Sequence, residues 1–282
     1  MRNLHKYEEF FPDEFNAEFK KSPVVYCSFG PVEQHGRHSA LGVDLIKGHE
    51  ICLRAAEISG GIVFPRIPFA PAGAYHKQFP RIPVKPAPCE YLLTRTEIHQ
   101  SFTGETKLTS FPGVFISADV CEKLYYELLE VFAEDIGFKV CVIMGSHGPA
   151  GELAKKIAMN KPVFKGMKMI VAGSLSHNMD LVEAEYKRLG LPRISHGGMW
   201  ESAMFMVSNP EYINPEKLKD AVPNASEKYW IDNYGQDAVP NYEEISKVSL
   251  EFGERLVQTA AERIAEDAMK ALDEMKHADE SK

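Results

Sequence analysis

The chain has 282 residues, of which 44% are hydrophobic and 26% charged, a composition typical of a soluble globular protein that buries a full core. Its formal net charge is −8 and it has no basic stripe, which excludes the electrostatic signature of a nucleic-acid-binding protein. No apolar run approaches the roughly 18 residues of a membrane-spanning helix, and the N-terminus lacks the apolar core of a signal peptide, so we expect a cytoplasmic protein with no membrane partner.

Strand-like and helix-like patterns alternate along the chain. Short apolar runs rich in β-formers predict strands, and apolar positions at helical spacing predict helices. The alternation predicts an α/β fold in which helices cover both faces of a mostly parallel sheet. The expected strands are 24–29, 62–67, 139–144 and 167–172, and the expected helices are 44–58, 120–136, 152–159, 184–189 and 245–275.

Residues 77–112 interrupt this alternation. The stretch 77–88 contains four prolines, and no βαβ unit fits there. We interpret 77–112 as an excursion from the core that covers the mouth of a site or makes a subunit contact, with a plain surface loop as the alternative. No repeat and no domain boundary is evident, so we predict a single domain over residues 1–282.

The cysteines are scattered and lie mostly within apolar segments. They lack the CxxC spacing of metal and redox motifs, so we expect buried free thiols in a reducing cytoplasm. The five are Cys27, Cys52, Cys89, Cys121 and Cys141.

The most informative segment follows the first predicted strand and runs from Glu33 to Asp44. Glu33 and His35 are two residues apart, so on an extended backbone their side chains project to the same side. Asp44 lies where the next predicted helix begins. Carboxylate oxygens and neutral imidazoles together suit zinc, manganese or iron better than calcium. The segment therefore predicts a metal site and hydrolytic chemistry, with a solvated surface pair as the plainer alternative.

Two later loops contain further candidates. His147 lies at the end of the third predicted strand, and because the carboxyl ends of parallel strands share one edge, we expect it near Glu33. Residues 195–202 add His196 and, where an apolar helix begins, Glu201. Glu201 has a structural alternative, because an acidic residue in the first turn of a helix also complements the helix dipole.

The other histidines are weaker candidates. His38 lies within the first segment and is a candidate for orienting a ligand. His76 is a candidate for lining a pocket, and His49 is expected to pack on the helix 44–58.

Taken in order, three segments resemble motifs of the creatininase (creatinine amidohydrolase) family. The segment from Glu33 to Asp44 resembles the first motif, with Glu33-Gln34-His35-Gly36, His38, Leu41-Gly42 and Asp44 in matching places. Residues 145–148 are similar to the second motif through His147. Residues 196–202 are similar to the third through His196, Glu201 and Ser202. The matches extend over about residues 24–206.

The resemblance implies a single three-layer α/β/α domain, two divalent metal ions per chain (Zn, Mn or Fe) and a homo-oligomer, usually a hexamer. It also implies that Asp44 bridges the ions and that His196 is the acid/base group beside a small amide substrate. Two divalent ions and one hydroxide would neutralise three converging carboxylates and activate water for attack on an amide carbon. The predicted metal ligands are Glu33, His35, Asp44, His147 and Glu201, and the predicted catalytic residues are His196 and Glu201.

The second motif departs from the family pattern. Pro149 stands where family members have a carboxylate that serves the metals, and residues 148–195 contain no tryptophan to cover a flat creatinine ring. We therefore expect a small non-peptide or cyclic amide other than creatinine. Two alternatives stay open: a formamide hydrolase of a cofactor pathway, and a degenerate, non-catalytic member that binds a ligand or serves in an assembly.

Overall fold

A five-stranded sheet forms the centre of the computed structural model, which describes residues 4–71, 113–223, 231, 235 and 239–280. Four of its strands are parallel to one another, forming three parallel pairs, and the short edge strand is antiparallel to its neighbour. Across the sheet the strands are β3 (Ile62–Val63), β1 (Val24–Phe29), β5 (Val140–Gly145), β7 (Met167–Ala172) and β6 (Val163–Phe164). The mostly parallel sheet expected from the sequence is confirmed.

The central strands are apolar on both sides, as strands between two helical layers must be. In β1, Tyr26 belongs to one buried cluster while its neighbour Cys27 belongs to the cluster on the opposite face. In β5, Val142 and Ile143 divide in the same way. Because side chains alternate along a strand, each strand contributes to both cores.

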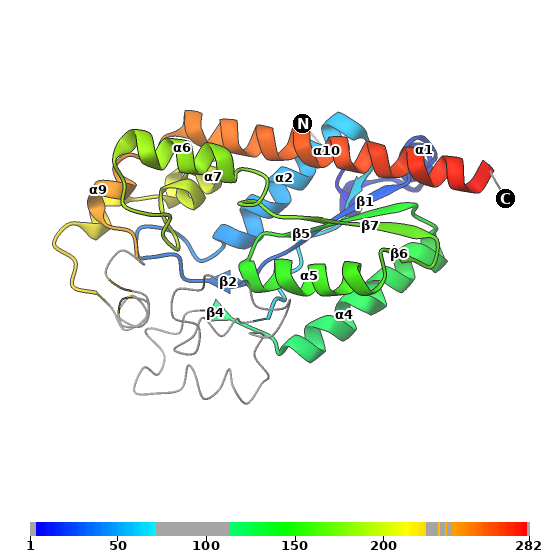
Figure 1. The fold of residues 1–282 in the computed structure, drawn as a ribbon, viewed down its shortest axis with the longest axis horizontal. Coiled ribbons are helices and arrows are strands. Elements are labelled where there is room, and N and C mark those ends of the chain that lie inside the picture. The colour runs from blue at the N-terminus through cyan, green and yellow to red at the C-terminus, as the bar shows by residue number, and fades with distance from the viewer. Residues whose placement is uncertain (1–3, 72–112, 224–230, 232–234, 236–238, 281–282) are drawn as a thin grey trace.

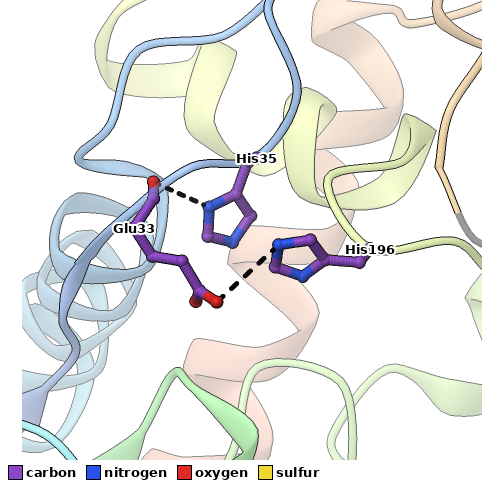
Figure 2. Close-up of side chains that lie close together, drawn as sticks. All are labelled: Glu33, His35 and His196. Atoms are coloured by element: carbon purple, nitrogen blue, oxygen red, sulfur yellow. Dashed lines mark hydrogen bonds and ion pairs between the residues drawn. The ribbon is translucent and has the colours of Figure 1, made fainter. Parts of the chain in front are cut away.

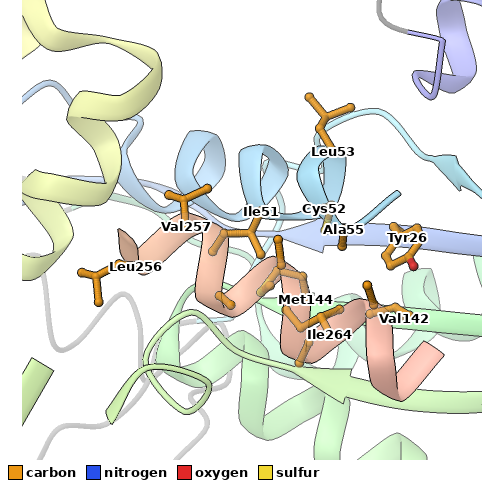
Figure 3. Close-up of a cluster of buried hydrophobic side chains, with 14 of the residues drawn as sticks. Tyr26, Ile51, Cys52, Leu53, Ala55, Val142, Met144, Leu256, Val257 and Ile264 are labelled. Atoms are coloured by element: carbon orange, nitrogen blue, oxygen red, sulfur yellow. The ribbon is translucent and has the colours of Figure 1, made fainter. Parts of the chain in front are cut away.

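Helices cover both faces (Figure 1). The helices α2 (Val43–Ser59) and α10 (Leu250–Glu280) lie over one face, and α7 (Met199–Ser208) packs against both of them. The helices α4 (Ala118–Glu130) and α5 (Gly148–Asn160) lie over the other face. Figure 3 shows the hydrophobic core between the sheet and the helices α2 and α10, where Ile51 of α2 and Ile264 of α10 meet strand residues such as Met144. The three-layer α/β/α fold is therefore confirmed.

Shorter elements complete the described chain. Phe19 of helix α1 (Pro12–Lys21) packs against Phe138, which precedes β5. Their ring centroids lie 5.2 Å apart. The strands β2 and β4 form a separate antiparallel pair next to the main sheet. These elements are η1 (Tyr7–Glu9), α1 (Pro12–Lys21), β2 (Val32–Glu33), β4 (Gly113–Val114), η2 (Val131–Ile136), α6 (Met179–Leu189), η3 (Pro210–Tyr212), η4 (Pro215–Leu218) and α9 (Tyr242–Ile245).

Several expected boundaries were wrong. The helix expected at 152–159 begins at Gly148, because Pro149 fits the first turn of a helix. The long helix expected at 245–275 is divided into α9 and α10, since the Ser249 hydroxyl accepts the Phe252 N–H and starts a new helix. The strand expected at 62–67 is shorter in the structure, where β3 ends at Val63. Pro65 has no N–H to donate to a neighbouring strand.

Four cysteines, Cys27, Cys52, Cys121 and Cys141, are buried and free, as expected. Cys89, His76 and the excursion at 77–112 lie outside the described residues. None of the described helices combines the length and the apolarity that crossing a membrane would require.

Candidate metal centre

Four segments converge at the carboxyl edge of the parallel strands. Glu33 ends β2 just after β1, and His147 is the N-cap residue of α5 directly after β5. Asp44 and Glu201 lie in the first turns of α2 and α7. The predicted ligands Glu33, His35, Asp44, His147 and Glu201 are all buried. The structure brings them together, while their roles as metal ligands and as catalytic groups stay predictions.

Glu33, Asp44 and His147 form the first ligand group. His147 Nδ1 lies 3.0 Å from Glu33 Oε2 and 3.2 Å from Asp44 Oδ2. Within the described residues, neither of these two oxygens has a hydrogen-bond partner. Ligands about 2.0–2.2 Å from one zinc ion lie about 3–3.5 Å from each other, so the three residues fit a divalent metal.

The charges in the first group explain the shifts in pKa. Burial alone would lower the pKa of His147, but the carboxylates of Glu33 and Asp44 outweigh burial and raise it to about 9. Burial would raise the pKa of Asp44, yet the charges of Lys47 and His35 hold it well below its usual value. Asp44 is therefore ionised, as a metal ligand must be.

His35, Asp44 and Glu201 form the second ligand group. His35 Nε2 lies 3.4 Å from Asp44 Oδ2 and 3.7 Å from Glu201 Oε1. The other ring nitrogen, Nδ1, donates to the Glu33 carbonyl oxygen at 3.2 Å. That bond fixes the tautomer and directs Nε2 at the two carboxylates.

Lys47 lies between the two carboxylates of the second group and was missed in the sequence. Its side chain is fully buried, and Nζ donates to Asp44 Oδ1 at 2.6 Å and to Glu201 Oε1. Burial alone would lower the pKa of Lys47, but the carboxylates of Asp44 and Glu201 outweigh burial and raise it. The signal was the spacing: Asp44 and Lys47 are three residues apart and share one face of α2.

His196, in the segment 195–202, also lies next to this cluster. Its Nε2–H donates to the Gln34 carbonyl oxygen at 2.9 Å and lies 3.8 Å from Glu33 Oε1. Figure 2 shows the ring beside that of His35, with centroids 4.4 Å apart. Burial and the charge of His35 lower the pKa of His196, against a smaller opposite effect of Glu33. Glu33, His35 and His196 form a third group that could hold a metal ion, and with 19% of its side chain exposed His196 is the most open member of the cluster.

Tight backbone packing fixes the loop that presents His196. Gly197 has φ of 69°, and a Cβ there would collide with the carbonyl oxygen of His35, so only glycine fits. Its N–H donates to Glu201 Oε2 at 2.7 Å. Glu201 therefore also accepts a backbone N–H next to the start of α7. A structural role at that helix start is the alternative that the sequence suggests for Glu201.

Two further residues connect the motifs. Ser202 Oγ donates to the Gly197 carbonyl oxygen at 3.2 Å and accepts from His38 Nε2 at 2.9 Å. His38 therefore helps to hold the third segment through Ser202. Glu244, which the sequence did not single out, accepts from Ser195 Oγ and from the Met199 N–H, both at 2.9 Å.

A cavity of about 530 Å³ opens over the cluster. Its lining includes His35, Asp44, His147, His196, Trp200 and Glu201. The remaining wall includes glycines and serines of the segments 145–148 and 173–176. Because these side chains are small, the cavity has room for a small molecule next to the ligand groups.

Comparison with known proteins agrees with this geometry. The creatininase (creatinine amidohydrolase) family model matches residues 8–90. A protein from Bacteroides fragilis NCTC 9343, provisionally assigned as a creatinine amidohydrolase, is 18% identical over 96% of this chain and 97% of its own, with a TM-score of 0.63. A creatininase designated Mn is 17% identical over 94% and 97%, with a TM-score of 0.66.

A mutant creatininase of the Zn–Zn type is 16% identical over 96% of this chain and 98% of its own, with a TM-score of 0.65. No curated protein matches the chain. At these identities the structural likeness establishes the fold. The chain thus has the creatininase fold along nearly its whole length and matches the creatininase family over residues 8–90, which confirms the resemblance found in the sequence.

Proposed function

We propose that the protein is a metal-dependent amidohydrolase that hydrolyses a carbon–nitrogen bond of a small, non-peptide amide. The main support is the first ligand group, in which two buried carboxylates and one imidazole converge within 3.2 Å without hydrogen bonds that would satisfy Glu33 Oε2 and Asp44 Oδ2. A divalent ion bound there supplies a Lewis acid and a source of hydroxide near neutral pH. Zinc and manganese, which suit this donor set, are the metals we propose.

His196 is the proton-transfer group in this proposal. Its lowered pKa keeps the ring neutral near pH 7, and the Nε2–H is committed to the Gln34 carbonyl oxygen. Nδ1 is consequently the proton-accepting nitrogen of the ring. An amide nitrogen is too basic to leave as an anion, so His196 would accept the proton released by the attacking water and deliver it to that nitrogen as the carbon–nitrogen bond breaks.

The cavity supports a small substrate. Its volume of about 530 Å³ and its glycine and serine walls suit a compact amide, and Trp200 supplies one aromatic side chain. Residues 148–195 supply no tryptophan, which supports an amide other than creatinine; formamides belong to the same chemical class. We further propose, from the family resemblance, a cytoplasmic homo-oligomer, whose mass sedimentation analysis would measure.

A non-catalytic ligand-binding protein is the second candidate. The observation that favours it is Lys47, which already pairs with two of the carboxylates in the cluster. Tight binding of a metabolite without turnover across a panel of amides and formamides would support this candidate over the hydrolase.

The test of the hydrolase is metal removal followed by variants of two cluster residues. Chelation should abolish amide hydrolysis, and zinc or manganese should restore it. Asp44→Ala should lose more than about 10³-fold in kcat/KM, because Asp44 belongs to two of the three candidate ligand groups. His38→Ala should lose about 10–100-fold, as residues that orient a site do. Undiminished hydrolysis by folded, metal-free Asp44→Ala protein would refute the proposal.

A further inference from the structure

The Lys47 ammonium lies between Asp44 and Glu201, two of the three residues of the second ligand group. We propose that Lys47 replaces the second cation of a binuclear site, so that the chain binds one divalent metal ion, at Glu33, Asp44 and His147, instead of the two expected from the sequence. The inference rests on the proposed function, since it concerns the metal content of the same site. It assigns a role to the buried charge of Lys47, which the proposed hydrolysis does not otherwise require.

The hydrogen bonds of the second ligand group support this assignment. Nζ donates to one oxygen of Asp44 and one oxygen of Glu201, two of the three members of that group. The other oxygen of Glu201 accepts the Gly197 N–H at 2.7 Å. Both oxygens of Glu201 therefore have donors, whereas Glu33 Oε2 and Asp44 Oδ2 face, among the described residues, only imidazole nitrogens, those of His147 and His35.

The charges point the same way. The cluster contains three buried carboxylates, those of Glu33, Asp44 and Glu201. The ammonium and one divalent ion together neutralise them. A second divalent ion bound to Glu201 Oε1 would share that oxygen with Nζ, so the two cations would lie within about 5 Å of each other in a site with little water. Such a pair of cations repels strongly and leaves the cluster with excess positive charge.

The surroundings of Lys47 keep the ammonium in place. The side chain is fully buried in α2, one turn after Asp44, and Nζ lies 4.9 Å from the centroid of the Trp200 ring. A cation over an indole face is favourably placed. The segment 145–151 supplies only His147 as a ligand-capable side chain, because Ser146 Oγ donates to the Phe29 carbonyl oxygen.

The experiment measures metal per chain by elemental analysis after saturation with zinc or with manganese and removal of the excess. The wild-type chain should bind about one ion, and Lys47→Met, which removes the ammonium but keeps an apolar stem, should bind about two. Lys123→Met on the exposed face of α4 removes the same charge far from the cluster and should stay at one. In the manganese-loaded samples, electron paramagnetic resonance should show an isolated ion in the wild type and a spin-coupled pair in Lys47→Met.

A double variant identifies where the second ion binds. Lys47→Met combined with His35→Ala should return to one ion, because the second ligand group loses its imidazole. If Lys47→Met does not fold, Lys47→Gln keeps a hydrogen-bonding side chain without the charge and is measured in its place. Two ions in the wild type, or one ion in a folded uncharged variant, would overturn the inference and leave the proposed function standing. No metal in any protein would refute the proposed function itself.

Discussion

His196 differs from the other two histidines of the cluster in what surrounds its ring. Carboxylates raise the pKa of His35 and of His147 against the effect of burial, whereas burial and the neighbouring His35 charge lower that of His196. His196 is committed through Nε2 to a backbone carbonyl and is the most exposed of the three rings. The lowered pKa of His196, next to two histidines that face carboxylates, supports the proton-transfer role proposed for it.

Replacing His196 by alanine should therefore separate catalysis from metal binding. We expect kcat to fall by about 10²–10⁴-fold, the usual contribution of a general acid or base, with unchanged metal content. Steady-state kinetics and elemental analysis of the same samples measure both effects, and His277→Ala at the exposed end of α10 is the control. A variant that loses its metal would instead place His196 among the ligands.

The residues of the cluster differ in how readily a sequence reveals them. Glu33, His35 and Asp44 lie within one short segment, and His147 follows a recognisable strand, so their meeting at one sheet edge was predictable. Lys47 was not, because a lysine on an amphipathic helix is normally solvated. Its spacing from Asp44 is compatible with an ion pair, but the burial of that pair depends on Glu201, far along the chain. Glu244 was missed for the same reason: its partners precede it by 45 residues or more.

At the level of elements, α9 fixes the start of α7. Glu244 of α9 accepts hydrogen bonds from Tyr186 Oη at 2.7 Å, from Ser195 Oγ and from the Met199 N–H. Met199 is the first residue of α7, so the carboxylate of Glu244 caps that helix from outside and complements its dipole. Glu244 of α9 thus holds both ends of the loop that contains His196, through hydrogen bonds to Ser195 and Met199.

Glu244→Ala should destabilise the protein and disturb the site together. Three buried donors would lose their acceptor, which should reduce the free energy of unfolding by about 3 kcal/mol, and activity should fall because the His196 loop loses its anchor. Denaturant unfolding and kinetics measure the two effects. Glu243→Ala, a neighbouring exposed residue that pairs with Lys247 on the surface, should change stability by less than about 1 kcal/mol. Equal effects of the two substitutions would contradict the capping role.

At the scale of the whole molecule, the order of strands and helices followed from the alternating pattern, while the helix ends did not. The boundaries at Gly148 and Ser249 depend on single capping and turn positions that periodicity does not reveal. The core between α2, α10 and the sheet is nearly all apolar. His49 of α2 is one of the buried polar residues, and burial together with the charges of Arg66 and Lys6 lowers its pKa to about 4.

His49 should consequently contribute a loss of stability in mild acid, while His147, whose pKa is raised, contributes in the opposite direction. Between about pH 6.5 and pH 4 the unfolded chain binds a proton at His49 that the folded chain does not, so the free energy of unfolding decreases as pH falls. From this group alone we expect a loss of about 2 kcal/mol between pH 8 and pH 5. His49→Leu should remove that part of the pH dependence in denaturant unfolding measured at both values. An unchanged slope in the variant would assign the acid sensitivity to other groups.

The buried ammonium of Lys47 also bears on the order in which the chain folds and acquires its metal. Carboxylates gathered without a counter-charge repel one another and oppose compaction. Here Asp44 and Glu201 find their cation within the same polypeptide, so the start of α2 can dock on the start of α7 before any ion arrives. A newly synthesised chain would then fold in a metal-poor cell and bind its ion later. Metal supply would control the activity of the protein and not its folding.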